Sequence, residues 1–124
     1  MNKVISSPAA PAAIGPYSQA ILAGDTLYVS GQLPVIPSEG IIPDGIEAQT
    51  RQSLMNIRAI LEEAGFAMGD IVKTTVLLAD MNDFSAMNAE YSVFFPFVKP
   101  ARVCFQAAAL PKGALVEIDA IAVK

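Results

Sequence analysis

The fold is decided by two stretches near the C-terminus, Pro100-Ala101-Arg102-Val103-Cys104-Phe105 and Leu115-Val116-Glu117-Ile118-Asp119-Ala120-Ile121. Both predict β-strands, because β-branched and aromatic residues dominate them and turn residues bound them. Side chains alternate between the faces of a strand, so Arg102 and Cys104 share one face of the first strand. On the second strand, Glu117 and Asp119 lie opposite an apolar face. A guanidinium and a carboxylate on strands that otherwise predict core can bind an anion and transfer a proton.

Two helices are predicted before these strands. The first is expected to begin at Asp44, with Glu47 three residues later in a capping-box arrangement, and to end at Gly65. The second is expected to begin at a cap formed by Asn82 or Asp83. Its apolar residues recur at helical spacing and predict a core-facing stripe of Phe84, Met87, Tyr91 and Phe94.

Three further strands complete the predicted fold. Residues 17–23 and 26–30 form two of them, joined by a tight turn at Gly24-Asp25, and residues 71–79 form the third. The predicted order is ββ-α-β-α-ββ, an α+β fold with one sheet, and residues 1–124 are expected to form a single domain. Two helices can cover only one face of that sheet, so the other face is expected to pack against another subunit.

The composition also predicts an oligomer. Hydrophobic residues make up 53% of the chain and charged residues 16%, against about 25% charged in an average soluble domain. A small chain with so few charges would expose a large apolar surface as a monomer. The net charge of −4 and the pI of about 4.6 exclude the strongly basic class of nucleic-acid binders, because Lys and Arg are also scattered.

The residue types narrow the possible chemistry. The chain has no histidine and one cysteine, which excludes Ser–His and Cys–His nucleophile pairs, His-ligated metals, thiolate zinc cages and internal disulfides. Catalysis would have to use carboxylates, hydroxyls, backbone groups and water. The N-terminus lacks a hydrophobic signal core, and no apolar run approaches membrane-spanning length. We therefore expect a cytoplasmic protein without a membrane partner.

Several motifs, in order along the chain, resemble the RidA (YjgF-type) family of reactive-intermediate imine deaminases. The most specific match is residues 100–105 followed by Leu110 and Val116-Glu117-Ile118. The other matches are Ile14-Gly15-Pro16-Tyr17-Ser18-Gln19-Ala20, Ser30-Gly31-Gln32, Gly69-Asp70-Ile71-Val72-Lys73-Thr74-Thr75-Val76 and Asn88-Ala89-Glu90-Tyr91. The resemblance runs from about Ser6 to Val123 and implies a chorismate-mutase-like fold and a homotrimer with a ligand cleft at each subunit interface.

The resemblance also implies an activity and the residues for it. Members of the family hydrolyse enamines and imines, such as 2-aminoacrylate, to 2-keto acids and ammonia, without a metal or organic cofactor. By position, Arg102 corresponds to the arginine that binds the substrate carboxylate, and Glu117 to the glutamate that positions water. Tyr17 corresponds to the tyrosine at the cleft, and main-chain contacts fall on Gly31 and Cys104.

Each of these residues also has a structural interpretation. Arg102 could be an ion-pair partner at a subunit interface, and Glu117 could merely neutralise it or a lysine of another subunit. Tyr17 could simply pack, Gly31 could form a turn, and Cys104, without a base partner, could be a small core residue. Asp119, which shares the face of Glu117, is the alternative carboxylate.

Two other functions compete with deamination. One is a non-enzymatic regulatory trimer that binds a carboxylate metabolite through Arg102. The other is ribonuclease activity or translation inhibition, which the low pI, the missing histidine and the absence of a basic stripe argue against. The chain also has only residues 96–99 between Phe95 and Pro100, where many family members have a longer loop, so substrate size stays open.

Overall fold

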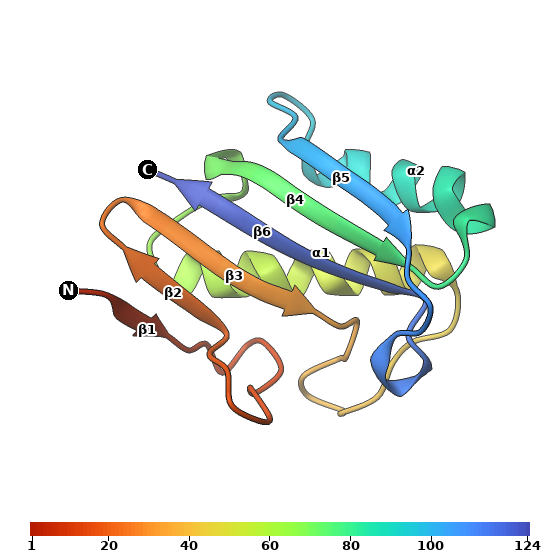
Figure 1. The fold of residues 1–124 in the computed structure, drawn as a ribbon, viewed down its shortest axis with the longest axis horizontal. Coiled ribbons are helices and arrows are strands. Elements are labelled where there is room, and N and C mark those ends of the chain that lie inside the picture. Colours follow the sequence, from red (N-terminus) through yellow and green to blue (C-terminus); the bar gives the residue numbers. More distant parts are fainter.

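The chain forms one six-stranded sheet with two helices on one of its faces, as a computed structural model of residues 1–124 shows (Figure 1). The strands are β1 (Lys3–Ile5), β2 (Ala20–Ala23), β3 (Thr26–Gln32), β4 (Ile71–Leu78), β5 (Ala101–Gln106) and β6 (Val116–Val123). The helices are α1 (Ile46–Glu63) and α2 (Phe84–Phe94), with short 3₁₀ turns at Met68–Asp70, Met81–Asp83 and Pro111–Gly113. None of the helices is long and apolar enough to cross a membrane.

The two C-terminal strands, β5 and β6, take different places in the sheet. The strand order is β1-β2-β3-β6-β4-β5, so β6 is central and β5 is an edge strand. Strands β4 and β5 are parallel and are joined by α2, whereas the other neighbours are antiparallel. Gly24, with φ of 60°, begins the turn between β2 and β3, where the sequence predicted a hairpin.

The predicted α+β architecture is confirmed, with one sheet and two helices on one face, and the structure adds one strand. β1 pairs with β2 at the opposite edge from β5, which gives the order βββ-α-β-α-ββ. Its three residues are too few to show a period in the sequence. The predicted strand from residue 17 begins only at Ala20, so Tyr17 lies in the preceding loop.

The predicted cap of α1 is wrong in detail, whereas Asp83 occupies the N-cap position of α2, one of the two residues predicted there, although its side chain makes no capping hydrogen bond. α1 begins at Ile46 after Gly45, whose backbone takes the cap position without a side-chain hydrogen bond, so no capping box forms at Asp44. The short turn at residues 81–83 that leads into α2 has its own cap, because the side chain of Asp80 accepts a hydrogen bond from the Asn82 N–H.

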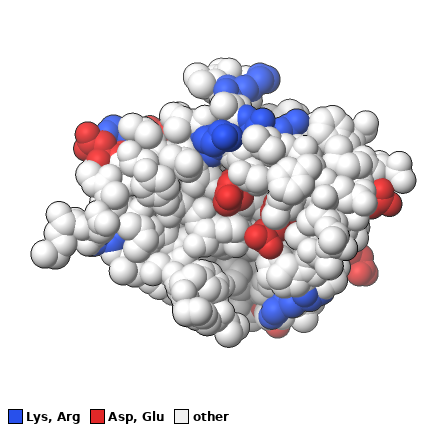
Figure 2. Space-filling view, in the orientation of Figure 1, with Lys and Arg blue, Asp and Glu red and all other residues white.

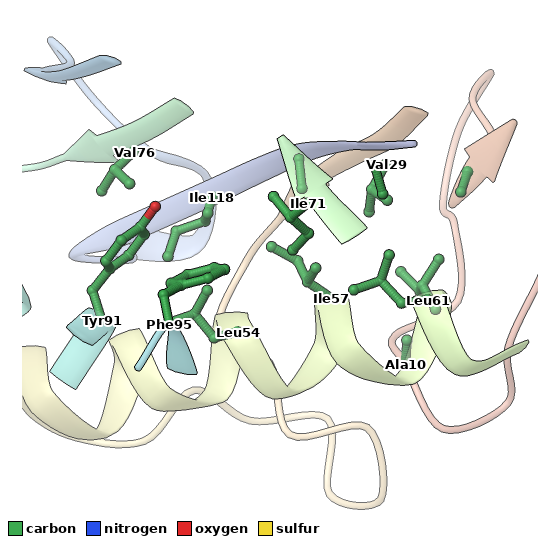
Figure 3. Close-up of a cluster of buried hydrophobic side chains, with 14 of the residues drawn as sticks. Ala10, Val29, Leu54, Ile57, Leu61, Ile71, Val76, Tyr91, Phe95 and Ile118 are labelled. Carbon is green, nitrogen blue, oxygen red and sulfur yellow. The ribbon is translucent and has the colours of Figure 1, made fainter. Parts of the chain in front are cut away.

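The core lies between the sheet and the helices (Figure 3). Alternate residues of β6, Val116, Ile118, Ala120 and Ala122, are at most 1% exposed and face the helices. They meet the α1 stripe that includes Leu54, Ile57 and Leu61. Truncation of such a residue to alanine costs about 2–5 kcal/mol of folding free energy. The intervening residues of β6, including Glu117 and Asp119, consequently point to the other face.

That other face of the sheet carries no helix (Figure 1). It includes large apolar side chains that are about half exposed, Tyr28 at 51%, Val103 at 45% and Phe105 at 49%. Seen from this side, the surface is mostly uncharged, with acidic side chains near its centre (Figure 2). An apolar face of this kind is typical of a protein–protein interface.

Candidate functional site

A cavity of about 800 Å³ lies at the end of β3, between the N-terminal segment and the 3₁₀ turn that precedes β6. Tyr17, Gly31 and Glu117, which are three of the residues proposed from the sequence, all line it. The volume falls in the range of small-molecule sites. The cavity is thus a site that the fold itself builds around the predicted carboxylate.

Glu117 lies directly over Gly31. A methyl group added to Gly31 would overlap with the Glu117 carboxylate, so a larger residue at this position would displace the Glu117 side chain. Gly31 belongs to β3, where the register with β6 shifts between Val29 and Gln32. The sequence predicted a turn or a main-chain contact with a ligand at Gly31, and the structure has a bulged strand there rather than a turn.

The two neighbouring carboxylates of β6 differ in their surroundings. Asp119 accepts a hydrogen bond of 2.9 Å from the Thr75 N–H of β4, which commits it to the sheet. Glu117 makes no such bond, and its pKa is raised from the ordinary range by partial burial and, to a lesser degree, by the negative charge of Asp119. Glu117 is therefore the carboxylate that the sheet leaves free to act as a proton acceptor.

The walls of the cavity are fixed by polar side chains. Gln19 is 3% exposed, and its amide donates 3.1 and 2.8 Å hydrogen bonds to the carbonyls of Ser7 and Pro11. From α1, Asn56 donates to the carbonyls of Leu33 and Val35 at 3.1 and 3.0 Å. These bonds hold the N-terminal segment and the loop after β3 against the body, so the cavity is preformed.

Tyr17 and Lys112 bring polar groups to the same cavity. The Tyr17 side chain is 51% exposed, and its hydroxyl accepts a long hydrogen bond of 3.4 Å from the Ile14 N–H. Lys112, for which the sequence predicted no role, has a left-handed backbone with φ of 60° in the turn that leads into β6. It is the one basic residue among those that line the cavity, opposite in charge to Glu117. The structure contains no group of three or more His, Cys, Asp or Glu side chains that could hold a metal.

Arg102 lies elsewhere, on the helix-covered face of β5. Its Nη1 donates a 2.8 Å hydrogen bond to Asn88 Oδ1 of α2. Its Cζ lies 4.8 Å from the centre of the Tyr91 ring and 5.6 Å from that of Phe84. Arg102 makes no ion pair within the chain. Its positive charge is therefore held in place without being neutralised.

The sheet register separates Arg102 from Glu117. Arg102 is level with Thr74 of β4 and Ala120 of β6, whose side chains are buried toward the helices. Glu117 is level with Leu77 and Phe105, on the open face. Residues directly opposite one another on neighbouring strands share a face. One copy of the chain therefore cannot bring Arg102 and Glu117 to the same ligand.

Cys104 accompanies Arg102 on the helix-covered face, level with Val76 and Ile118. It is partly buried, and burial raises the pKa of its thiol while the nearby Arg102 charge lowers it. A thiol in this setting stays protonated at neutral pH. Because β5 is an edge strand, half of its backbone groups face away from β4 and are free for other partners.

The sequence did not predict the contacts that the Arg102 guanidinium makes with side chains of α2. Tyr91 and Phe84 were expected to be core, and Tyr91 is indeed 7% exposed, but both rings also contact the guanidinium. Asn88 was part of a motif without an assigned role. Its place, one turn before Tyr91 on the same helix face, was the available signal, because residues three apart on a helix are neighbours.

Comparison with known proteins agrees with the fold and the motifs. A family profile described as Endoribonuclease L-PSP matches residues 7–124. The chain is 50% identical over 127 residues to the 2-iminobutanoate/2-iminopropanoate deaminase of Escherichia coli strain K12, covering 100% of this chain and 99% of that protein. It is 54% identical over 128 residues to a RutC family protein of Pasteurella multocida, with coverage of 100% and 99%.

A solved structure extends the comparison to three dimensions. The crystal structure of E. coli TdcF with bound serine superposes with a TM-score of 0.96 at 46% identity and covers 98% of both chains. The profile match covers residues 7–124, and the relatives at about 50% identity span 100% of this chain. The chain therefore belongs to the YjgF/RidA family, which the profile describes as Endoribonuclease L-PSP.

Proposed function

We propose that this protein is a deaminase that hydrolyses small 2-imino acids, such as 2-iminobutanoate and 2-iminopropanoate, to 2-keto acids and ammonia. The observation that carries the proposal is the Glu117 carboxylate, partly buried over Gly31 in a preformed cavity and without a hydrogen-bond partner in the chain. The full-length relative from E. coli that is named a 2-iminobutanoate/2-iminopropanoate deaminase supports the choice of substrate.

The chemistry needs little from the protein. Water adds to the carbon of the C=N bond, and the resulting carbinolamine loses ammonia to leave the C=O bond of the keto acid. The substrate is already reactive, so the site must only hold it by its carboxylate and place a water molecule. Glu117 would orient that water and accept its proton, and the Tyr17 hydroxyl and main-chain groups near Gly31 and Cys104 would contact the substrate.

We further propose that the protein is a homotrimer in which the site forms between two copies. Glu117 and Arg102 lie on opposite faces of the sheet, and the open face is apolar. Arg102 lies on the edge strand β5, at the margin of the sheet, so packing through the open face would place this margin of one copy against the cavity of its neighbour, where Arg102 would bind the substrate carboxylate. The number three comes from the family resemblance.

The direct test generates the imine in situ from serine or threonine with a dehydratase. The release of 2-keto acid is then followed with and without this protein. Faster keto-acid release at micromolar protein supports the proposal. If the protein binds 2-keto acids but does not change the lifetime of the imine, the result would favour binding without turnover.

That second function has one observation in its favour, the serine bound to the related TdcF. Serine carries the carboxylate that Arg102 is proposed to bind, so a regulatory trimer that senses a carboxylate metabolite would use the same groups. The cavity carboxylate speaks for deamination, because a receptor for anions gains nothing from the additional negative charge of Glu117.

The pH profile should report the environment of Glu117. Burial and the charge of Asp119 both raise the pKa of Glu117, and the base must be ionised to act. Activity should therefore rise with pH through that raised pKa. Asp119→Asn removes the neighbouring charge while an amide oxygen can still accept from the Thr75 N–H, so the acidic limb of the kcat/KM profile should move to lower pH. A profile that stays in place would contradict this account of Glu117.

A further inference from the structure

The aromatic ring beneath Arg102 is itself anchored to the sheet. The Tyr91 hydroxyl lies 2.8 Å from Thr74 Oγ1, and the two groups share a buried hydrogen bond. Thr74 is fully buried, and Figure 3 shows Tyr91 rising from α2 with its oxygen directed toward the sheet. Thr74 is also the residue of β4 that lies level with Arg102 of β5. Thr74 and Arg102 are thus neighbours on paired strands, and Thr74 binds the ring that lies under the Arg102 guanidinium.

We infer that Tyr91 and Thr74 are positioning residues that fix the Arg102 guanidinium in the orientation in which it binds a ligand carboxylate. The inference rests on the proposed role of Arg102. An arginine side chain has many rotamers, and two-point binding of a carboxylate uses only a few of them. A flat ring at 4.8 Å and the Asn88 oxygen at 2.8 Å from Nη1 together restrict the plane of the guanidinium. Tyr91 and Thr74 therefore set substrate affinity and leave the attack of water to Glu117.

Burial keeps the Tyr91 phenol uncharged. The pKa of Tyr91 is raised chiefly by burial, against smaller lowering effects of the Thr74 hydrogen bond and the Arg102 charge. The phenol thus stays protonated and supplies a ring and one hydrogen bond rather than a counter-charge. Arg102 consequently keeps its full positive charge for the ligand.

The competing account is that Tyr91 only packs. Its ring also meets that of Phe95, with centroids 4.7 Å apart, inside the main core. A packing role predicts lower stability for any truncation and no selective effect on affinity. A positioning role predicts an increase in KM with an unchanged kcat, because uniform binding of ground state and transition state is lost.

The experiment compares four variants, each measured for KM and kcat with in-situ imine and for the Kd of 2-oxobutanoate by calorimetry. Tyr91→Leu should raise KM and Kd about 5- to 30-fold with kcat unchanged, because the ring is lost. Tyr91→Phe and Thr74→Val should each give a smaller increase of about 2- to 5-fold. The double variant Tyr91→Phe/Thr74→Val should be no worse than either single one, since both break the same hydrogen bond.

Phe94→Leu is the matched control. Phe94 lies on the same helix and packs under a different arginine, with Arg58 Cζ 5.4 Å from its ring centre. It should leave KM and Kd unchanged. An equal increase in KM for Phe94→Leu would show that a looser α2 is the cause and would overturn the inference.

Arg102→Ala, measured beside the others, separates the two proposals. If it abolishes 2-oxobutanoate binding while a folded Tyr91→Leu protein binds normally, the positioning role of Tyr91 is wrong and the proposal that Arg102 binds the carboxylate stands. If Arg102→Ala itself binds normally, that proposal for Arg102 is wrong, and the inference about Tyr91 and Thr74 is wrong with it. If Tyr91→Leu does not fold, Tyr91→Phe and Thr74→Val decide: unchanged KM in both would overturn the positioning role.

Discussion

Replacement of Glu117 by glutamine is expected to lower kcat about 10²–10⁴-fold, because that is the usual contribution of a positioned general base. The amide keeps the shape of the side chain over Gly31 but cannot accept the proton of the attacking water. Binding of 2-oxobutanoate should persist, since Arg102 is unchanged. Steady-state kinetics with an in-situ imine, together with calorimetry, measure both quantities.

The stability of Glu117→Gln gives the control for this result. The pKa of Glu117 is raised in the folded chain, so its ionised form weakens folding, and that destabilisation grows as the pH rises through the raised pKa. Glutamine removes the charge, and the variant should unfold at the same temperature as the parent protein or above it at pH 7. A variant that assembles normally and turns over at the parental rate would exclude Glu117 as the base. If Glu117→Gln no longer assembles into the trimer, the role of Glu117 is structural.

Replacement of Arg102 by alanine is expected to abolish measurable carboxylate binding. Loss of one partner of a desolvated charge pair costs about 2–5 kcal/mol of binding free energy. Arg102 has no acidic partner in the chain, so a bound carboxylate would be its first counter-charge. Calorimetry with 2-oxobutanoate should show no heat of binding at millimolar ligand.

The variant Arg51→Ala is the control for a general charge effect. Arg51 forms an exposed ion pair with Glu90 at 3.0 Å, and such surface pairs contribute little. It removes the same charge away from the proposed site and should bind 2-oxobutanoate normally. Normal binding by Arg102→Ala as well would show that the carboxylate anchor lies elsewhere, and Lys112 of the cavity would be the next residue to examine.

The sequence predicted the fold well because the periodic signals were long. Strand β6 alternates over eight residues and α1 repeats its apolar stripe over 18, so both elements were found. The short β1 and the cap at Gly45 escaped, because three residues show no period and a glycine cap depends on the backbone alone. Whether so short a segment forms a strand or a cap depends on tertiary contacts, which a local sequence pattern does not contain.

The sequence predicted the residue types of the site but not their arrangement. Glu117 and Arg102 were each assigned to the correct strand, with the correct neighbours on the same face of that strand. Whether the two residues share one face of the sheet depends on how β5 and β6 pair with β4, and the sequence of a single strand does not contain that register. The contacts of Arg102 with Asn88 and Tyr91 join residues 11 to 14 positions apart. Such contacts follow from the packing of α2 on the sheet, so they became visible only in three dimensions.

The separation of Arg102 and Glu117 makes mixed assembly the most direct test of the central claim. Inactive Arg102→Ala and Glu117→Gln proteins would be unfolded together, refolded in equal amounts and assayed for imine hydrolysis. If each site takes Arg102 from one copy and Glu117 from the next, a mixed trimer has one intact site, and random mixing should restore about a quarter of the parental activity. Failure of the mixture to exceed its two components, while the parent protein refolds to full activity, would contradict a site shared between copies.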